Sequence, residues 1–367
     1  MKDVMQFALL GHPADYDHFT RLAEAGGHGD RRQRLEKHER TFAKLIEWMP
    51  SYATSHRPGL TLDGIVLEGR LIVCPFFPER IGSPQQMKRA HDKVVAGCRL
   101  AKEFGASVVA LGGFTSILEG AHGNTLAADL GLTITSGNSL TAALAVAQLR
   151  AALEAAGRPA ENETIAVIGA TGDVGRACTQ LLATVAGKLI LIARNRTRLE
   201  RLRTEVRSAA AVEIDVDPRA ALAAGSVIAA TSTATPIVDP SELRPGSIVC
   251  DVGFPKNLSD AAASRDDVLI FSGGLAQLPD AIDLQSYAAL PSPRLIHGCF
   301  CEGIVLAARP ESRTLAASQG EAEAERATAL LALAAGLGIA PAPLYTGGRL
   351  VDREEIAKMC RSEMAIL

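Results

Sequence analysis

Residues Thr164–Gly175 read Thr-Ile-Ala-Val-Ile-Gly-Ala-Thr-Gly-Asp-Val-Gly, and this stretch decides the fold class. A β-branched apolar run leads into three glycines, and a predicted helix, RACTQLLATVAG, follows them. Such glycines allow a sharp turn, a close approach of the backbone to a pyrophosphate and tight packing of the helix on the strand. The helix N-terminus offers unpaired N–H groups to the phosphates. We therefore predict, rather than a purely structural turn, a dinucleotide-binding loop formed by Gly169, Thr171, Gly172, Asp173, Val174 and Gly175.

Five further β-branched runs follow the first one as far as Gly274, and helical or loop segments separate them. They are KLILIAR, VEIDV, GSVIAAT, SIVCDVG and VLIFSGG. Continuous apolar strands that alternate with helices are typical of a parallel sheet covered on both faces. A glycine loop at the start of such an alternation has the context that supports a dinucleotide site. The fold class is therefore predicted to be α/β, with a central doubly wound parallel sheet of the Rossmann type.

The flanking regions predict two further parts of the chain. Residues 1–140 carry short strand-like runs, QFALLGH, LIVCPFF and SVVALGGF, with the helical stretch PQQMKRAHDKVVAGCRLAKEFG among them, which predicts an α/β domain. Residues 141–292 then form the nucleotide-binding domain. After Pro293 the pattern is helical again, so we expect a helical C-terminal portion over residues 293–367.

The end of the second predicted strand of the central sheet indicates which dinucleotide is bound. An NAD site usually places Asp or Glu there, to accept from the ribose 2′-hydroxyl. This chain instead reads Ile192-Ala-Arg-Asn-Arg-Thr-Arg198. Arg194 and Arg196, with Asn195 between them, are suited to a 2′-phosphate, because guanidinium matches phosphate oxygens geometrically. NADPH is therefore the predicted cofactor; a basic helix start facing solvent is the alternative, and it fits Arg198 better than Arg194.

Composition limits the classes of function. The chain has 367 residues, 47% hydrophobic residues and a net charge of −3, so its overall charge gives no support to a role with nucleic acid. Seven scattered cysteines suggest reduced thiols in the cytoplasm, and the eight dispersed histidines mark no metal site. We expect no targeting or transmembrane segment. The apolar run from Ala327 to Leu344 is rich in Ala and ends in prolines, so it predicts a packed helix instead.

Six phrases, taken in order, resemble one family: the long-chain acyl-(acyl-carrier-protein) reductases, which supply fatty aldehydes to alkane-forming pathways. They are Ala110-Leu-Gly-Gly-Phe-Thr-Ser116, Thr135-Ser-Gly-Asn-Ser-Leu-Thr141, Gly169-Ala-Thr-Gly-Asp-Val-Gly175, Leu191-Ile-Ala-Arg-Asn195, Phe254-Pro-Lys-Asn257 and Cys299-Phe-Cys-Glu302. The resemblance runs from LLGH near the start to about Leu344. It implies an N-terminal acyl-substrate domain, NADPH as reductant and an acyl thioester of carrier protein or coenzyme A as substrate. An aldehyde-consuming enzyme is a further expected partner.

The resemblance also implies a covalent mechanism. A cysteine attacks the thioester, and hydride transfer to the resulting acyl-enzyme releases the aldehyde. Cys299 matches the family's nucleophile in LIHGCFCEG, whereas Cys301 falls at the variable position. A helix expected to begin near Glu302 would lower the pKa of Cys299. His297 is a candidate base, with a structural histidine as the alternative. For Cys299 and Cys301, the alternative is a pair of ordinary buried thiols.

Other matched positions predict the substrate site. Gly113 and Phe114 would bring backbone N–H groups to an acyl oxygen, and the hydroxyls of Thr115 and Ser116 would donate to it or else cap the next helix. Thr135 and Asn138 would contact substrate or cap the helix from Ser139. Lys256 would reach the cofactor or substrate, with a surface lysine as the alternative.

Two regions, residues 14–57 and residues 345–367, depart from the family phrases, so acyl-chain length and carrier preference stay open. Two other functions also stay open. One is an NADP-dependent alcohol or carbonyl oxidoreductase of the shikimate-dehydrogenase type, which needs no covalent intermediate. The other is a non-catalytic NADP-binding regulator that docks an acidic protein through the arginine-rich helix after Arg194.

Overall fold

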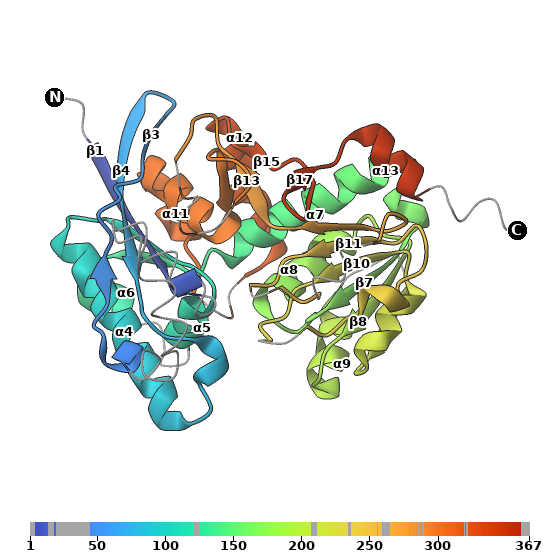
Figure 1. The fold of residues 1–367 in the computed structure, drawn as a ribbon, viewed down its shortest axis with the longest axis horizontal. Helices are drawn as coiled ribbons and strands as arrows, with labels where there is room; N and C mark the ends of the chain where they lie inside the picture. The colour runs from blue at the N-terminus through green and yellow to red at the C-terminus, as the bar shows by residue number, and fades with distance from the viewer. Residues whose placement is uncertain are drawn as a thin grey trace, which may run out of the picture. The chain divides into compact units, whose positions relative to one another are not determined.

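The computed structural model describes residues 4–13, 18–19, 45–120, 125–206, 211–233, 236–254, 256–258, 265–282, 284, 287, 290–318, 320 and 322–360. Contacts group the chain into two compact units (Figure 1). The first comprises Met1–Gly137, Leu278–Gln319 and Leu333–Ile339; the second comprises Asn138–Gln277, Gly320–Ala332 and Ala340–Leu367. The three-part division at residues 140 and 292 stays a prediction. Much of segment 14–57 and the end of the tail 345–367 lie outside the described residues.

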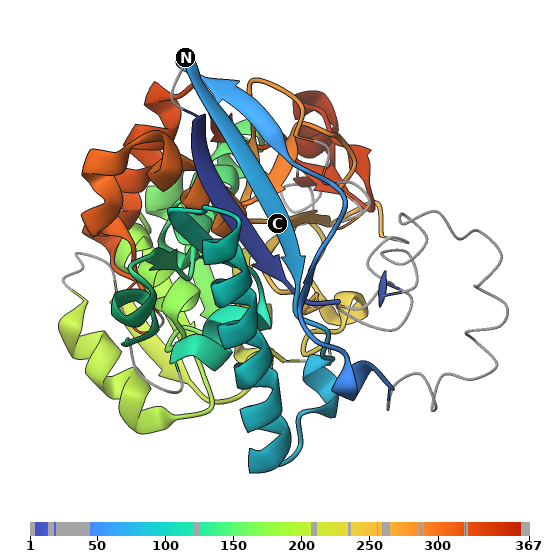
Figure 2. The same cartoon turned by 90° about the vertical axis from the view of Figure 1, so that its left-hand side faces the viewer.

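The first unit contains a mixed six-stranded sheet of order β2-β4-β1-β5-β6, with β3 paired to β4. Its strands are β1 (Val4–Gly11), β2 (Tyr52–Ala53), β3 (Gly59–Leu62), β4 (Ile65–Val73), β5 (Val108–Leu111) and β6 (Thr133–Thr135). The neighbours β4, β1, β5 and β6 run parallel, and Figure 2 shows the long strands β1 and β4 side by side. The hairpin β3–β4 was not predicted. Its two-residue turn, Asp63-Gly64, has positive φ at both residues, the conformation that such tight hairpins require.

Helices cover both faces of this sheet. The helices of this unit are α4 (Pro84–Glu103), α5 (Phe114–Gly120), α6 (Thr125–Leu130) and α11 (Gly298–Ala308). The unit also contains the 3-10 turns η1 (Pro78–Arg80) and η6 (Pro310–Leu315) and the strand β14 (Leu295–His297). On one face, Leu10 packs against α4 at Gly97. On the other face, Ala110 packs so closely against α11 that a Cβ at Gly303 would lie 2.5 Å from the Ala110 Cβ. Side chains alternate along a strand, so α4 and α11 take the two faces.

The second unit contains a six-stranded parallel sheet of order β12-β11-β10-β7-β8-β9. Its strands are β7 (Thr164–Ile168), β8 (Lys188–Ile192), β9 (Ala211–Asp215), β10 (Ser226–Ala229), β11 (Ile248–Asp251) and β12 (Leu269–Ser272). All six coincide with the β-branched runs of the sequence. In chain order this is the 3-2-1-4-5-6 arrangement of doubly wound dinucleotide-binding sheets. The predicted α/β fold class with a central Rossmann-type sheet is confirmed.

Apolar clusters fill both faces of the second sheet. Alternate strand residues such as Val167 and Leu191 face a cluster that includes helix residues, while Ala166 and Ile190 face the opposite cluster. The remaining elements of this unit are α7 (Asn138–Ala155), α8 (Asp173–Leu182), α9 (Arg196–Glu205), α13 (Arg353–Cys360), β13 (Leu275–Gln277), β15 (Ala340–Pro341), β16 (Tyr345–Thr346), β17 (Arg349–Leu350), η2 (Ala160–Asn162), η3 (Pro218–Ala223) and η4 (Pro240–Glu242). The helix α12 (Ala324–Gly336) begins in the second unit, and its last residues belong to the first. Among the described residues we find no helix whose length and apolarity would let it span a bilayer.

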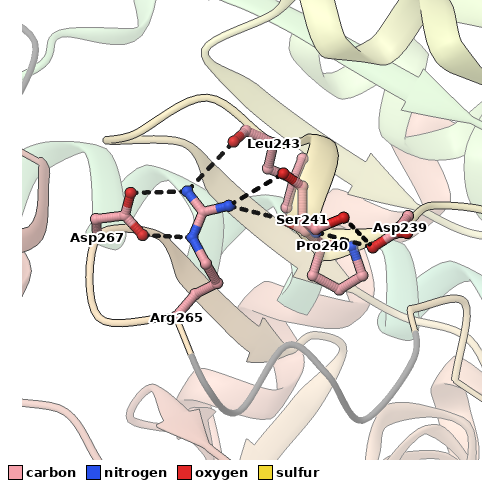
Figure 3. A network of polar contacts seen from close by, with 6 residues as sticks. All are labelled: Asp239, Pro240, Ser241, Leu243, Arg265 and Asp267. Carbon is pink, nitrogen blue, oxygen red and sulfur yellow. Dashed lines mark hydrogen bonds and ion pairs between the residues drawn. The ribbon is translucent and has the colours of Figure 1, made fainter.

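A network around Arg265 secures one edge of the second sheet (Figure 3). Its guanidinium forms a fork with the Asp267 carboxylate, with bonds of 2.5 and 2.7 Å. The same group donates to the carbonyl oxygens of Pro240 and Leu243, at 3.0 and 3.3 Å. Arg265 thereby ties the η4 turn to the chain entering β12.

We expect Arg265→Ala to lower the free energy of unfolding by about 2–3 kcal/mol, because it leaves partly buried carbonyls and a carboxylate without their charged donor. Arg219→Ala is the matched control. Arg219 also pairs with an η4 residue, Glu242, but its side chain is 72% exposed against 22% for Arg265. The control should therefore cost less than about 1 kcal/mol. Chemical denaturation of both variants tests this; equal losses would contradict the proposed role of the Arg265 network.

Candidate active site

The thiol of Cys299 lies in the first turn of α11. This helix begins at Gly298, directly after β14, with the extended residue His297 at its N-cap. The sequence prediction that the helix begins near Glu302 is therefore wrong by about one turn. The chain passes from strand to helix without a loop, and the first N–H groups of α11 have no partner within the helix. Cys299 is partly exposed, whereas Cys301 is fully buried.

The surroundings of Cys299 raise its pKa. Burial is the largest cause, and the Glu302 carboxylate adds to it; the backbone N–H groups of Gly113 and Phe300 act in the opposite direction. The result is a pKa of about 11 for the Cys299 thiol. The sequence prediction of a lowered pKa is therefore wrong, because desolvation outweighs the helix N-terminus. Burial also raises the pKa of Cys301.

Gly137 lies directly against the backbone of Cys299. Its φ is +69°, and a Cβ there would overlap Cys299 Cα and come within 2.5 Å of the Cys299 carbonyl oxygen. Thr135 secures this approach: its hydroxyl oxygen accepts from the Gly137 N–H at 3.3 Å and donates to the buried carboxylate of Glu302. The end of β6 and the start of α11 are thus held together by Thr135 and Glu302, and this pairing positions the thiol.

The loop before α5 brings one amide to Cys299. The hydroxyls of Thr115 and Ser116 each donate, at 2.9 Å, to a carbonyl three residues earlier, on Gly112 and Gly113. The N–H of Phe114 donates to His12 Nε2 at 2.9 Å. Of the predicted substrate residues Gly113, Phe114 and Thr115, the last two begin α5, and Gly113 has the N–H that acts on the Cys299 sulfur.

Sequence reasoning assigned no role to His12 or Glu302, although both stand in the quoted phrases. His12 is fully buried, stacks on Phe76 at a centroid distance of 4.9 Å and has its Nδ1 2.8 Å from the Pro13 carbonyl. Burial lowers the pKa of His12 to about 4, so the imidazole is neutral. With the proton on Nδ1, Nε2 can accept from Phe114 and fix the loop. The signal available in the sequence was a histidine at the end of a buried strand.

The dinucleotide loop has the geometry that its glycines predict. Gly169 has a φ of +81°, and a Cβ there would overlap the Ala230 carbonyl. A Cβ at Gly175 would overlap the Gly169 carbonyl, so α8 is packed closely on the end of β7. Among the described residues no side chain caps α8 at Gly172, and the amides of its first turn suit an anion. These residues fit the pyrophosphate of a dinucleotide; Thr171, Gly172 and Val174 are partly or fully exposed beside them.

Asp173 and Asn138 come together, although the sequence assigned them to different sites. Asp173 Oδ2 accepts from Asn138 Nδ2 at 3.0 Å and from the Gly320 N–H at 2.6 Å.

The three predicted 2′-phosphate residues follow β8 and are exposed. Asn195 caps α9, its Oδ1 accepting from the Arg198 N–H at 3.0 Å, and Arg196 pairs with Glu200 at 3.3 Å. Among the described residues no hydrogen bond or ion pair engages the Arg194 guanidinium. Its predicted contact with a 2′-phosphate stays a prediction.

Lys256 lies in a loop shaped by Asp251, a buried residue at the end of β11. The Asp251 carboxylate accepts from the N–H groups of Gly253, Asn257 and Leu258 at 2.8 to 3.1 Å. Lys256 is exposed and donates from Nζ to the Asp251 carbonyl at 3.1 Å. Its predicted contact with cofactor or substrate stays a prediction, as do the roles of His297 and of the other predicted site residues.

A hollow of about 430 Å³, open to solvent, lies elsewhere on the first unit. Apolar side chains such as Phe76, Phe77 and Ile81 line it together with Arg80, Arg89 and Lys93. None of the predicted site residues belongs to its lining. No group of three or more His, Cys, Asp or Glu within the described ranges could hold a metal ion.

Comparison with known proteins places both sites in context. The family model "Shikimate / quinate 5-dehydrogenase" matches residues 151–272, the dinucleotide-binding part. The chain is 31% identical over 318 residues to a long-chain acyl-(acyl-carrier-protein) reductase of Synechococcus elongatus, covering 82% of this chain and 88% of that protein. It is 30% identical over 273 residues to the aminotransferase PigE of a Serratia species, but spans only 30% of that protein's length.

Two solved structures match at lower identity. Quinate dehydrogenase from Corynebacterium glutamicum, solved with NAD, is 17% identical over 73% of this chain and 88% of that one, with a TM-score of 0.34. Dipicolinate synthase A chain from Bacillus subtilis is 14% identical over 84% of this chain and 97% of that one, with a TM-score of 0.36. Scores this low carry no argument about function.

We expect Gly137→Ala to slow alkylation of Cys299 by iodoacetamide roughly tenfold or more, because the added methyl group must displace the Cys299 backbone. Gly157→Ala is the matched control: Gly157 has the same φ of +69°, but nothing lies within 4 Å of a Cβ there. Gly157→Ala should lower the free energy of unfolding by about 1 kcal/mol through backbone strain alone, and it should leave the alkylation rate of Cys299 unchanged. Peptide mass spectrometry of Cys299 measures the rate. Equal rates in the two variants would mean that Gly137 does not position the thiol.

The raised pKa of Cys299 predicts a distinctive pH profile. Only the thiolate is alkylated, and with a pKa of about 11 its fraction grows about tenfold per pH unit through pH 7 to 10. An ordinary thiol, with a pKa of about 8.5, levels off above pH 9. We expect the alkylation rate of Cys299 to be still rising at pH 10. A plateau below pH 9 would contradict the raised pKa.

Proposed function

The chain belongs to the long-chain acyl-(acyl-carrier-protein) reductase family, and we propose that it reduces an acyl thioester to the aldehyde through an acyl-enzyme on Cys299. Membership makes it an oxidoreductase with a nicotinamide cofactor, and its second sheet is of the type that binds dinucleotides. The acyl donor is a thioester of acyl-carrier protein or coenzyme A, and the cofactor is NADPH.

One observation carries the proposal. Cys299 is partly exposed in the first turn of a helix, with the Gly113 amide directed at its sulfur and Gly137 packed on its backbone. A structural thiol needs none of these features. Cys301, two residues away on the same helix, is fully buried. The geometry therefore favours Cys299 as the nucleophile.

Acyl transfer begins when Cys299 loses its proton and its sulfur attacks the thioester carbon. A new S–C bond forms, the bond to the donor sulfur breaks, and the departing thiolate takes up a proton. The tetrahedral intermediate carries an oxyanion on the carbon bonded to the Cys299 sulfur. We assign the Gly113 N–H to this oxyanion, because a backbone donor beside the sulfur is within reach of an oxygen one atom further on. His297, at the N-cap of α11, is the proposed base.

When bound, NADPH supplies the hydride that reduces the acyl carbon. The Cys299–carbon bond then breaks, the aldehyde leaves and the sulfur regains a proton. Because Glu302 and burial hold the pKa of Cys299 high, its thiolate is readily reprotonated after release. Thr135 and Ser116 support the site through the hydrogen bonds that they make inside the protein, to Glu302 and to Gly113.

Preference for NADPH rests on Arg194. Its exposed guanidinium follows β8, where an NAD site usually offers a carboxylate, and its neighbours Asn195 and Arg196 are engaged in α9. The cytoplasm as the location and an aldehyde-consuming enzyme as a partner remain part of the proposal.

Intact-mass measurement of the protein after incubation with palmitoyl and octanoyl thioesters, without NADPH, tests the acyl-enzyme. We expect the mass of one acyl group to be added to the wild type and to Cys301→Ala, and none to Cys299→Ala. NADPH should then discharge the adduct as aldehyde, much faster than NADH does.

Loss of labelling in Cys301→Ala alone would show that the other cysteine is the nucleophile. No adduct from any donor, in folded protein that still binds NADPH, would favour the non-covalent dehydrogenase or the regulator. The match of residues 151–272 to the shikimate and quinate dehydrogenase model makes the dehydrogenase the stronger of these two.

A further inference from the structure

The carboxylate of Asp173 lies at the first residue of α8, in the loop that we propose binds the pyrophosphate. Its Oδ2 accepts two hydrogen bonds from described residues, one from Asn138 Nδ2 at 3.0 Å and one from the Gly320 N–H at 2.6 Å. We call Asp173, Asn138 and Gly320 the Asp173 clasp. All three residues belong to the second unit.

Both donors of the clasp, Asn138 and Gly320, are the first residues of segments of the second unit. The first unit ends at Gly137 and, later, at Gln319; the second unit starts at Asn138 and resumes at Gly320. The clasp therefore holds the residue that immediately follows each of these two crossings. The carboxylate of Asp173, in the dinucleotide loop, restrains both of these residues.

On the other side of each crossing, within the first unit, the chain reaches the surroundings of the nucleophile. Gly137, the neighbour of Asn138, packs on the backbone of Cys299. Ala317, three residues before Gly320, accepts from the Ser136 N–H at 2.8 Å, and its own N–H donates to the Thr135 hydroxyl at 3.5 Å. A single peptide bond joins Gly137 to Asn138, so restraining Asn138 in the clasp restrains Gly137.

We propose that Asp173 is a positioning residue that couples occupancy of the dinucleotide loop to the reactivity of Cys299. A pyrophosphate on the first turn of α8 repels the Asp173 carboxylate, and the repulsion favours the orientation in which Oδ2 faces its two donors. Asn138 then holds Gly137, and Gly137 holds the backbone of Cys299 where the amides of Gly113 and Phe300 stabilise the thiolate. The inference rests on the proposed function for the loop ligand and the reactive thiol, but not on turnover.

The test measures the rate of Cys299 alkylation by iodoacetamide with and without saturating 2′-phospho-ADP-ribose. This probe carries the pyrophosphate and the 2′-phosphate but no nicotinamide, so a nicotinamide cannot shield the thiol. Each variant receives a concentration that is saturating by its own measured Kd. We expect the probe to raise the rate in the wild type by at least about fivefold, the lower end of ordinary coupling between sites.

Asp173→Asn is the decisive variant. Its amide oxygen can still accept from Asn138 and Gly320, but it carries no charge for the pyrophosphate to repel. The rate ratio, which is the alkylation rate with the probe divided by the rate without it, should therefore fall to about one. Asn138→Ala keeps the charge and removes a donor, and its ratio should fall as well. A purely structural clasp predicts a wild-type ratio in Asp173→Asn.

Gln180→Ala is the matched control. Gln180 also lies on α8 and accepts from a backbone N–H of the same later segment, that of Ala324, at 3.0 Å, but it holds neither crossing. Its rate ratio should stay near the wild-type value. A ratio of one in the wild type, or equal ratios in the wild type and Asp173→Asn, would overturn the inference. No acyl donor is used, so failure of the acyl-enzyme experiment would leave this result standing.

Discussion

The close approach of Gly137 to Cys299 is the constraint on which the proposed acyl site depends. Backbone lies against backbone there, at a residue with a left-handed conformation, so no side chain can take the place of the glycine. The position of the thiol is consequently set by the end of β6 and the start of α11 rather than by a flexible loop. Glu302 and Thr135 reinforce the approach, because a buried carboxylate is stable only when it accepts hydrogen bonds.

This rigid, desolvated position has a chemical consequence. Burial and the Glu302 charge raise the pKa of Cys299 to about 11, while the amides of Gly113 and Phe300 offset only part of the shift. A thiolate of high pKa is intrinsically a strong nucleophile, although it is sparsely populated near neutral pH. For the acyl transfer that we propose, proton removal would therefore accompany attack, and no stable thiolate would be stored.

Close backbone contact governs the dinucleotide loop as well. Gly169 and Gly175 leave no room for a Cβ, and together they bring α8 against the end of β7 with its first amides uncapped. The charged side chains near this loop lie at the carboxyl ends of the strands. Asn195 and Arg196 are engaged in α9, so the proposed phosphate contact falls to Arg194; Asp173 has its charge turned toward Asn138 and Gly320.

The sequence by itself determined the features that depend on local pattern. Six β-branched runs and a glycine loop predicted the second sheet because strand formation and tight turns are set by neighbouring residues, and six ordered phrases indicated the family. The hairpin turn at Asp63-Gly64, the start of α11 and the role of His12 escaped prediction. Only the tertiary structure decided the pKa of Cys299, since desolvation and the Gly113 amide come from residues far apart in the chain. It also decided the contact of Gly137 with Cys299, because a glycine in a sequence does not show which distant backbone it approaches.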